Sequence, residues 1–259
     1  VSHLIELRDR MIRALIAVGI VFGGLMLWPG AGALYDLLAA PLAKHLPQGA
    51  TLIATSVITP FLVPLKITLM AAFLVALPYV LYQIWAFVAP GLYSHEKRLV
   101  LPLVVSSTVL FFLGVGFVYF VVIPGLSEFI QLVAPKSITA APDVEEYFGF
   151  VLTLFLVFGI AFEVPIAVIV LVRIGVVSIE QLQKARGYFI VGAFIVAAIV
   201  TPPDVISQLA LAIPMCLLYE AGILVSRMAV RDKAAKADKA DKSEKAARAD
   251  DTGDSSLGD

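Results

Sequence analysis

The sequence predicts an all-α integral membrane protein with six transmembrane helices and both termini on the cytoplasmic side. Composition is the first reason: 60% of the 259 residues are hydrophobic, 15% are charged and the mean hydropathy is +0.96. Soluble domains are about 45–50% apolar and about 25% charged. The other two reasons are a series of long apolar runs and an uneven distribution of basic residues between the segments that connect them.

Six apolar runs define the predicted spans, which cover residues 11–28, 67–88, 99–124, 147–172, 188–200 and 205–225. The fifth run would form about 20 Å of helix, which is shorter than the roughly 30 Å hydrocarbon core. We therefore expect the bilayer to thin at this span or partner helices to cover its ends. Residues 1–230 form the predicted transmembrane domain, and the polar, Lys- and Asp-rich residues 231–259 are expected to be a disordered cytoplasmic tail.

Basic residues predict the orientation of these spans. With the N-terminus on the near side, ten Lys and Arg residues lie in the short near-side segments, and only Lys44, Lys66 and Lys136 lie on the far side. Short cytoplasmic loops carry the excess of Lys and Arg in membrane proteins. The near side is therefore predicted to be cytoplasmic, and an even number of spans returns the C-terminus to it.

The segments that flank the spans carry helix signals of their own. Residues 2–13 have the pattern of an amphipathic helix that lies at the membrane surface. Ser178 is placed to cap a short helix in the near-side loop 173–187. On the far side we expect an ordered cap at 29–66 and a loop at 125–146, with short helices at 35–43 and 57–66 interrupted by Pro41, Pro47 and Pro60.

Sequence motifs that mark several enzyme classes are absent. The pair His95-Glu96 has no second histidine at the spacing of a helical zinc site, and no nucleophile elbow or phosphate-binding loop occurs. The chain has three histidines, and Cys216 is its single cysteine. We therefore predict a protein that is not an enzyme, with no cofactor, no metal and no nucleic-acid partner.

Glu163 is the only charged residue inside the apolar run 147–172. A carboxylate near the centre of a membrane span costs roughly 2.5–3.5 kcal/mol on insertion scales, so such groups usually face protein or water. Glu163 therefore predicts a functional polar point inside the membrane. The alternative is a protonated acid that hydrogen-bonds an adjacent helix and serves packing alone.

Two further carboxylates, Glu6 and Glu96, lie on the predicted cytoplasmic side next to spans one and three. Two carboxylates can each take a guanidinium in a paired hydrogen-bonded fork, which suits a ligand with two adjacent arginines. The alternative is that each pairs with a neighbour such as Arg8 or Lys97 on a solvated surface.

Asp204 and Gln208 place polar groups at the start of the sixth span. Asp204 follows two prolines and is expected either to cap this helix or to take part in a contact. Gln208 lies one turn later on the same helix face.

Four stretches resemble the TatC family, the multispanning receptor subunit of the twin-arginine protein translocase. They are Ser2-His-Leu-Ile-Glu-Leu-Arg8, Leu92-Tyr-Ser-His-Glu-Lys-Arg-Leu99, Phe158-Gly-Ile-Ala-Phe-Glu-Val-Pro165 and Thr201-Pro-Pro-Asp-Val-Ile-Ser-Gln208. The resemblance runs from Ser2 to about Val230 with the order of the six spans intact. It implies a protein of the bacterial cytoplasmic membrane with a concave, glove-like bundle.

The resemblance also implies function and partners. It implies recognition of folded precursor proteins through signal peptides with paired arginines, and transport driven by the proton-motive force. The implied partners are the single-span subunits TatA and TatB, further copies of the chain and membrane lipid. The implied roles are arginine binding for Glu6 and Glu96, shaping of that site for Arg8 and Phe87, cap geometry for Pro41, signal-peptide insertion for Glu163, and partner contact for Thr201, Asp204 and Gln208.

Two other function classes share this composition. A proton-coupled secondary transporter of a small solute could use an intramembrane glutamate, but such proteins usually contain internal repeats with matching broken helices, and none is detected. A structural membrane scaffold would tolerate the loss of Glu96 and Glu163 without functional change.

Overall fold

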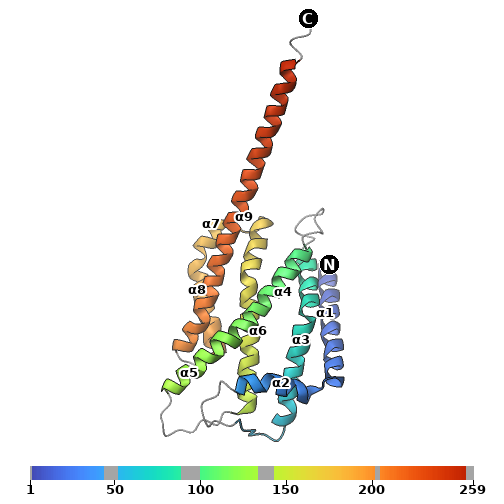
Figure 1. Cartoon of the computed structure of the whole chain (residues 1–259), viewed down its shortest axis with the longest axis vertical. Helices are drawn as coiled ribbons and strands as arrows, with labels where there is room; N and C mark the ends of the chain where they lie inside the picture. Colours follow the sequence, from blue (N-terminus) through green and yellow to red (C-terminus); the bar gives the residue numbers. More distant parts are fainter. Residues whose placement is uncertain (1, 44–51, 89–99, 134–142, 202–204, 255–259) are drawn as a thin grey trace.

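The computed structural model describes residues 2–43, 52–88, 100–133, 143–201 and 205–254. Within these stretches the chain forms a bundle of helices (Figure 1). Five helices in the described part are long and apolar enough to cross a membrane, and a shorter apolar helix corresponds to the fifth predicted span. The prediction of an all-α, multi-pass membrane protein is confirmed. The helices are α1 (Ser2–Leu27), α2 (Ala31–Ala43), α3 (Thr59–Val88), α4 (Val100–Phe117), α5 (Ile123–Val133), α6 (Val144–Arg173), α7 (Ile179–Lys184), α8 (Arg186–Val200) and α9 (Val205–Asp254).

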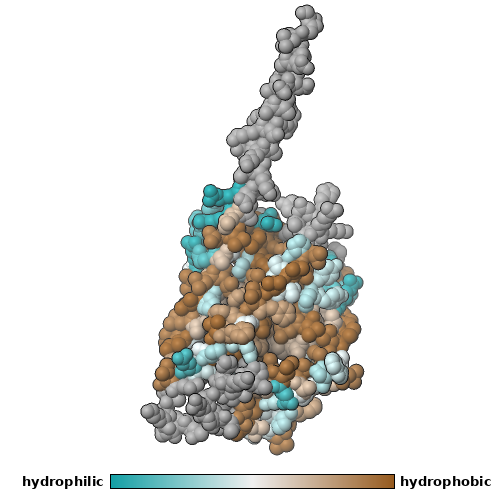
Figure 2. Space-filling view, in the orientation of Figure 1, coloured by the Kyte–Doolittle hydropathy of each residue, from teal (hydrophilic) through white to brown (hydrophobic). Residues whose placement is uncertain are grey.

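Helix α6 is the centre of the bundle and contacts α3, α4 and α9 (Figure 1). It contributes Phe148, Leu154 and Phe158 to the fully buried core. The start of α1 and the point where α9 leaves the bundle lie at the same end of the molecule (Figure 1). Figure 2 shows a broad hydrophobic surface over the middle of the bundle, with hydrophilic residues mainly toward its ends. This distribution suits a bundle surrounded by hydrocarbon.

Two glycines allow neighbouring helices to approach α6 closely. A Cβ at Gly114 of α4 would lie 2.7 Å from the carbonyl oxygen of Phe158, and a Cβ at Gly222 of α9 would lie 2.9 Å from Cα of Pro165. Backbone atoms cannot move aside as a flexible side chain can. The α4–α6 and α6–α9 contacts therefore depend on these two glycines.

We expect Gly114→Ala to lower the stability of the bundle by about 1–3 kcal/mol, the usual cost of overpacking a filled interior. Gly116→Ala is the matched control, because it lies on the same helix and a Cβ there meets nothing within 4 Å. Thermal unfolding in detergent measures the stability of both variants. A Gly114→Ala protein that melts as high as the Gly116→Ala protein would contradict the close approach.

Helix boundaries differ from the prediction on the first two spans. The amphipathic segment 2–13 is not a separate surface helix but the first part of α1, since no proline interrupts the chain up to Leu27. Residues 59–66 likewise form the start of α3 and not a separate helix. Pro60 is tolerated because it lies in the first turn, where the backbone N–H has no helical partner.

The third span continues beyond its predicted end at residue 124. A π-helical turn (Val118–Val122) joins α4 to α5, so helix extends to Val133 where a loop was expected. Pro124 has no N–H to donate to the carbonyl four residues earlier, and such a gap in the ladder favours a locally widened turn. Helix therefore continues through Pro124 and does not end there.

The tail also differs from the prediction, since α9 continues to Asp254 where a disordered segment was expected from residue 231. Alanine and lysine have high helix propensity, and extension of an existing helix avoids the unfavourable nucleation step.

The short connecting helix α7 has the predicted cap. Ser178 Oγ accepts from the Gln181 N–H at 3.2 Å, and the Ser178 N–H donates to Gln181 Oε1 at 2.8 Å. Helices α7 and α8 are then tied to α9. Tyr219 donates to the Leu182 carbonyl at 2.8 Å, and Arg186 Nε lies 2.6 Å from Glu220 Oε1.

Candidate functional site: carboxylates at two depths of the bundle

Glu6 lies in the first turns of α1 and is bound to a guanidinium. Arg10, four residues later, places Nη2 at 2.6 Å and Nε at 3.0 Å from Glu6 Oε1. Arg8 instead pairs with Asp9 at 2.9 Å. The alternative, in which Glu6 pairs with a neighbour, thus describes this structure, with Arg10 in the place suggested for Arg8.

Phe87 is half-buried near the end of α3, which contacts α1 along its length. The start of α1 and the end of α3 lie at the same end of the bundle, so Glu6 and Phe87 share that end (Figure 1). Glu96 lies outside the described residues. Pro41 belongs to α2, which ends two residues later at Ala43.

Glu163 lies where α3, α4 and α6 meet. Both of its carboxyl oxygens are buried, and neither makes a hydrogen bond of normal geometry with the described residues. The hydroxyl of Ser107, on α4, lies next to this carboxyl.

A groove of about 650 Å³ runs between α1, α3 and α6. Leu15 of α1, Phe73 of α3 and Leu156 of α6 contribute apolar walls, and Lys66 lies in its lining. Glu163 follows Leu156 by seven residues, which places it about two turns further along the same face of α6. An apolar segment that enters the groove would therefore approach Glu163.

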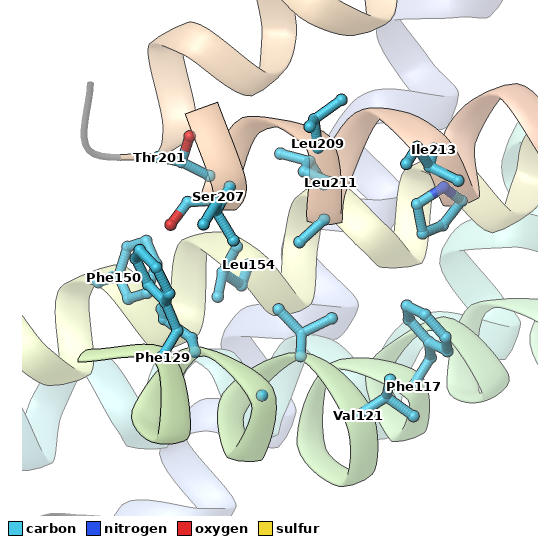
Figure 3. Close-up of a pocket in the computed structure, with 16 residues that line it drawn as sticks. Phe117, Val121, Phe129, Phe150, Leu154, Thr201, Ser207, Leu209, Leu211 and Ile213 are labelled. Atoms are coloured by element: carbon cyan, nitrogen blue, oxygen red, sulfur yellow. The ribbon is translucent and has the colours of Figure 1, made fainter. Parts of the chain in front are cut away.

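A second cavity, of about 400 Å³, lies between α5, α6 and the start of α9 (Figure 3). Its walls are almost entirely apolar, and Thr201 and Ser207 supply the hydroxyls that line it. The buried Thr201 hydroxyl donates to the Ala197 carbonyl at 2.8 Å. Gln208 is partly exposed on α9 beside Ser207, whereas Asp204 lies outside the described residues.

A carboxylate cluster at the opposite end of the bundle was not predicted. Asp143 caps α6 by accepting from the Glu145 N–H at 2.7 Å, and its other oxygen accepts from the N–H and the hydroxyl of Thr55. Glu145 binds Lys66 at 2.6 Å and accepts from Thr59 Oγ1 at 3.1 Å. The cluster ties residues 53–66 to the start of α6. Aspartate followed by Glu145 and Glu146 is an N-cap signal that sequence inspection could have found.

The Thr55 hydroxyl and backbone N–H hold the pKa of Asp143 below its usual value of 3.8. A carboxyl with a lower pKa in the folded state contributes stability above the unfolded value and loses it as the pH falls through the folded value. We expect Asp143→Ala to melt below the parent protein at neutral pH, and the difference to shrink as the pH falls below 3.8. Asp36→Ala, at an exposed position in α2, is the control. A difference that persists at low pH would contradict this assignment.

Comparison with known proteins adds to this geometry. The family model described as Sec-independent protein translocase protein (TatC) matches residues 2–214. The protein of that name from Halothiobacillus neapolitanus is 49% identical over 91% of this chain and 64% of its own length. The Escherichia coli K12 protein of the same name is 48% identical over 89% of this chain and 88% of its own length.

A solved structure has the same fold. A crystal structure described as the twin arginine translocase receptor TatC superposes with a TM-score of 0.77 at 43% identity. The alignment covers 88% of this chain and 99% of that chain.

Proposed function

Since the chain belongs to the TatC family, we propose that it is the receptor and core subunit of a twin-arginine translocase. It binds the signal peptides of folded precursor proteins through their paired arginines, and the proton-motive force drives export. It lies in a bacterial cytoplasmic membrane, with α8 as a sixth crossing and both termini in the cytoplasm. The observation that carries the proposal is the likeness, over 88% of the chain, to a solved twin arginine translocase receptor.

Glu6 and Glu96 bind the arginine pair in this proposal, and Arg8 and Phe87 shape the site. The Glu6–Arg10 contact supports it on chemical grounds, because two nitrogens of one guanidinium already approach Glu6 Oε1. Charge-assisted bonds of this kind favour arginine over lysine, since the planar guanidinium presents several donors in a fixed fork.

The apolar part of the signal peptide occupies the groove between α1, α3 and α6. Three properties support this assignment: the volume of about 650 Å³, the apolar walls and the position of Glu163 two turns beyond Leu156. Glu163 then meets a polar backbone group of the inserted peptide. Pro41 maintains the geometry of the cap at the far end.

The α8–α9 edge, with Thr201, Asp204 and Gln208, contacts TatA and TatB. Helix α8 has 15 residues, so its ends stay short of a full hydrocarbon core. Single-span partner helices would cover this edge, and further copies of the chain and membrane lipid would cover the remaining apolar surface. The cavity beside Thr201 gives such a partner side chain a place to enter (Figure 3).

Export in a bacterial strain without its own TatC tests the proposal. The chain is expressed with TatA and TatB from the same source, and the substrate is a folded fluorescent protein behind an Arg-Arg or a Lys-Lys signal peptide. We expect export of the Arg-Arg substrate alone, and its loss when an uncoupler removes the proton-motive force. Absent or sequence-indifferent export with stable expression of all subunits would favour the proton-coupled solute transporter.

A further inference from the structure

Three polar side chains from three helices lie near one another inside the bundle. The indole Nε1–H of Trp85, on α3, donates to Ser107 Oγ of α4 at 2.8 Å. Ser107 is 0% exposed and Trp85 is 8% exposed. The third group is the Glu163 carboxyl of α6, which lies next to the Ser107 hydroxyl. A polar cluster at this depth has to satisfy its own members, because hydrocarbon offers no partner.

The Ser107 hydroxyl makes a different hydrogen bond from the hydroxyls on either side of it. Ser106 Oγ donates to the Pro102 carbonyl at 2.8 Å, and Thr108 Oγ1 donates to the Val104 carbonyl at 2.7 Å. These are the bonds that helical hydroxyls ordinarily make to the preceding turn. Ser107 Oγ accepts from Trp85 instead, and a hydroxyl that accepts one bond still has its own proton to donate.

Close helix packing next to the cluster fixes the distance between α4 and α6. Phe111 lies one turn from Ser107 and is buried, and it packs against Gly159, one turn from Glu163. A Cβ at Gly159 would lie 2.3 Å from the Phe111 ring. The Phe111 ring therefore fills the space that Gly159 leaves open, and three residues along α4 a Cβ at Gly114 would lie 2.7 Å from the Phe158 carbonyl oxygen. These contacts place α4 against α6 within one turn of both Ser107 and Glu163.

We propose that Trp85 and Ser107 are positioning residues for Glu163. The Trp85 N–H orients the Ser107 hydroxyl, and the hydroxyl proton holds the Glu163 carboxyl between α3, α4 and α6, away from lipid. This rests on the proposed function of Glu163. The Glu163 carboxyl is still not fully hydrogen-bonded, because neither oxygen has a full hydrogen bond to the described residues. In the proposal, an inserted peptide supplies the missing partner.

The test is the rate at which dicyclohexylcarbodiimide, an apolar reagent for membrane carboxyl groups, modifies Glu163 in the purified chain without signal peptide. Mass spectrometry of the Glu163 peptide gives the rate. We expect Ser107→Ala and Trp85→Phe each to increase it by about two- to fivefold, where the upper factor is that of one lost hydrogen bond. The double variant should match the single variants, because both act through one contact.

Matched controls separate positioning from general loosening. Ser106→Ala removes the adjacent hydroxyl, and Trp28→Phe removes the indole of an exposed tryptophan. Both controls should keep the parent rate. Ser107→Thr retains the hydroxyl and should restore it. Melting temperatures measured on the same samples identify any variant that is globally destabilised. If the variant at Ser107 or at Trp85 is destabilised, the variant at the other of these two positions decides the test.

An unchanged labelling rate in folded Ser107→Ala or Trp85→Phe would overturn the proposal, as would an equal rise in Ser106→Ala. The outcome is independent of the receptor function, because no signal peptide is present. If the receptor function fails while labelling responds as expected, the positioning role stands by itself.

Discussion

Replacing Glu96 with alanine is expected to weaken the binding of an Arg-Arg signal peptide by about ten- to a hundredfold, since a hydrogen bond to a charged group contributes about 1.5–3 kcal/mol. The affinity for a Lys-Lys peptide should change little, so the preference for arginine disappears. Titration of the detergent-purified chain with a fluorescent peptide measures both affinities.

Glu6→Ala should have a smaller effect in the same titration. Glu6 is already paired with Arg10, and an incoming arginine has to displace that guanidinium before it can bind. The loss of the Glu6–Arg10 pair offsets part of the binding free energy of the new arginine contact, although an i,i+4 surface pair contributes only about 0.3–0.5 kcal/mol. Arg10→Ala should accordingly strengthen peptide binding slightly.

The control for both positions is Glu180→Ala, which removes an exposed carboxylate from α7. It should leave both affinities unchanged. If Glu180→Ala weakens binding as much as Glu96→Ala, general negative charge attracts the peptide, and the proposed paired site is wrong.

Replacing Glu163 with alanine is expected to leave arginine binding intact and to reduce deep insertion of the signal peptide by about tenfold, the effect of a lost buried polar contact. Photo-crosslinkers along the apolar part of the peptide report the depth. Crosslinks to the α6 wall of the groove, at Leu156, should be lost, and crosslinks near Phe87 should remain.

Glu163→Gln keeps a hydrogen-bonding group and should retain part of the insertion. Glu146→Ala, at an exposed position near the start of the same helix, is the control. An unchanged crosslinking pattern in Glu163→Ala would contradict the role of Glu163 in insertion.

The apolar runs predicted the helices well, because each long run must be buried in protein or lipid whatever its neighbours are. Prolines misled the assignment of boundaries. Pro60 suggested an interruption, but it occupies an initial turn of α3. The third span was expected to end at Pro124, but a π-helical turn just before this proline joins α4 to α5. Whether a proline ends a helix or redirects it depends on packing that lies outside the local sequence.

The candidate site was predictable in part. The pairing of Glu6 with Arg10 follows the i,i+4 rule and could have been expected from spacing alone. The bond from Trp85 to Ser107 joins residues 22 apart, and the bond from Thr55 to Asp143 joins residues 88 apart. Such contacts depend on which helices become neighbours, and a single sequence does not specify this.

The most direct test of the central claim is the binding of matched Arg-Arg and Lys-Lys signal peptides to the unmodified chain in detergent, without TatA or TatB. The proposed receptor function predicts clear preference for the Arg-Arg peptide, because only guanidinium groups satisfy both carboxylates through paired bonds. Equal affinity for the two peptides, or no binding of either by a folded chain, would contradict it.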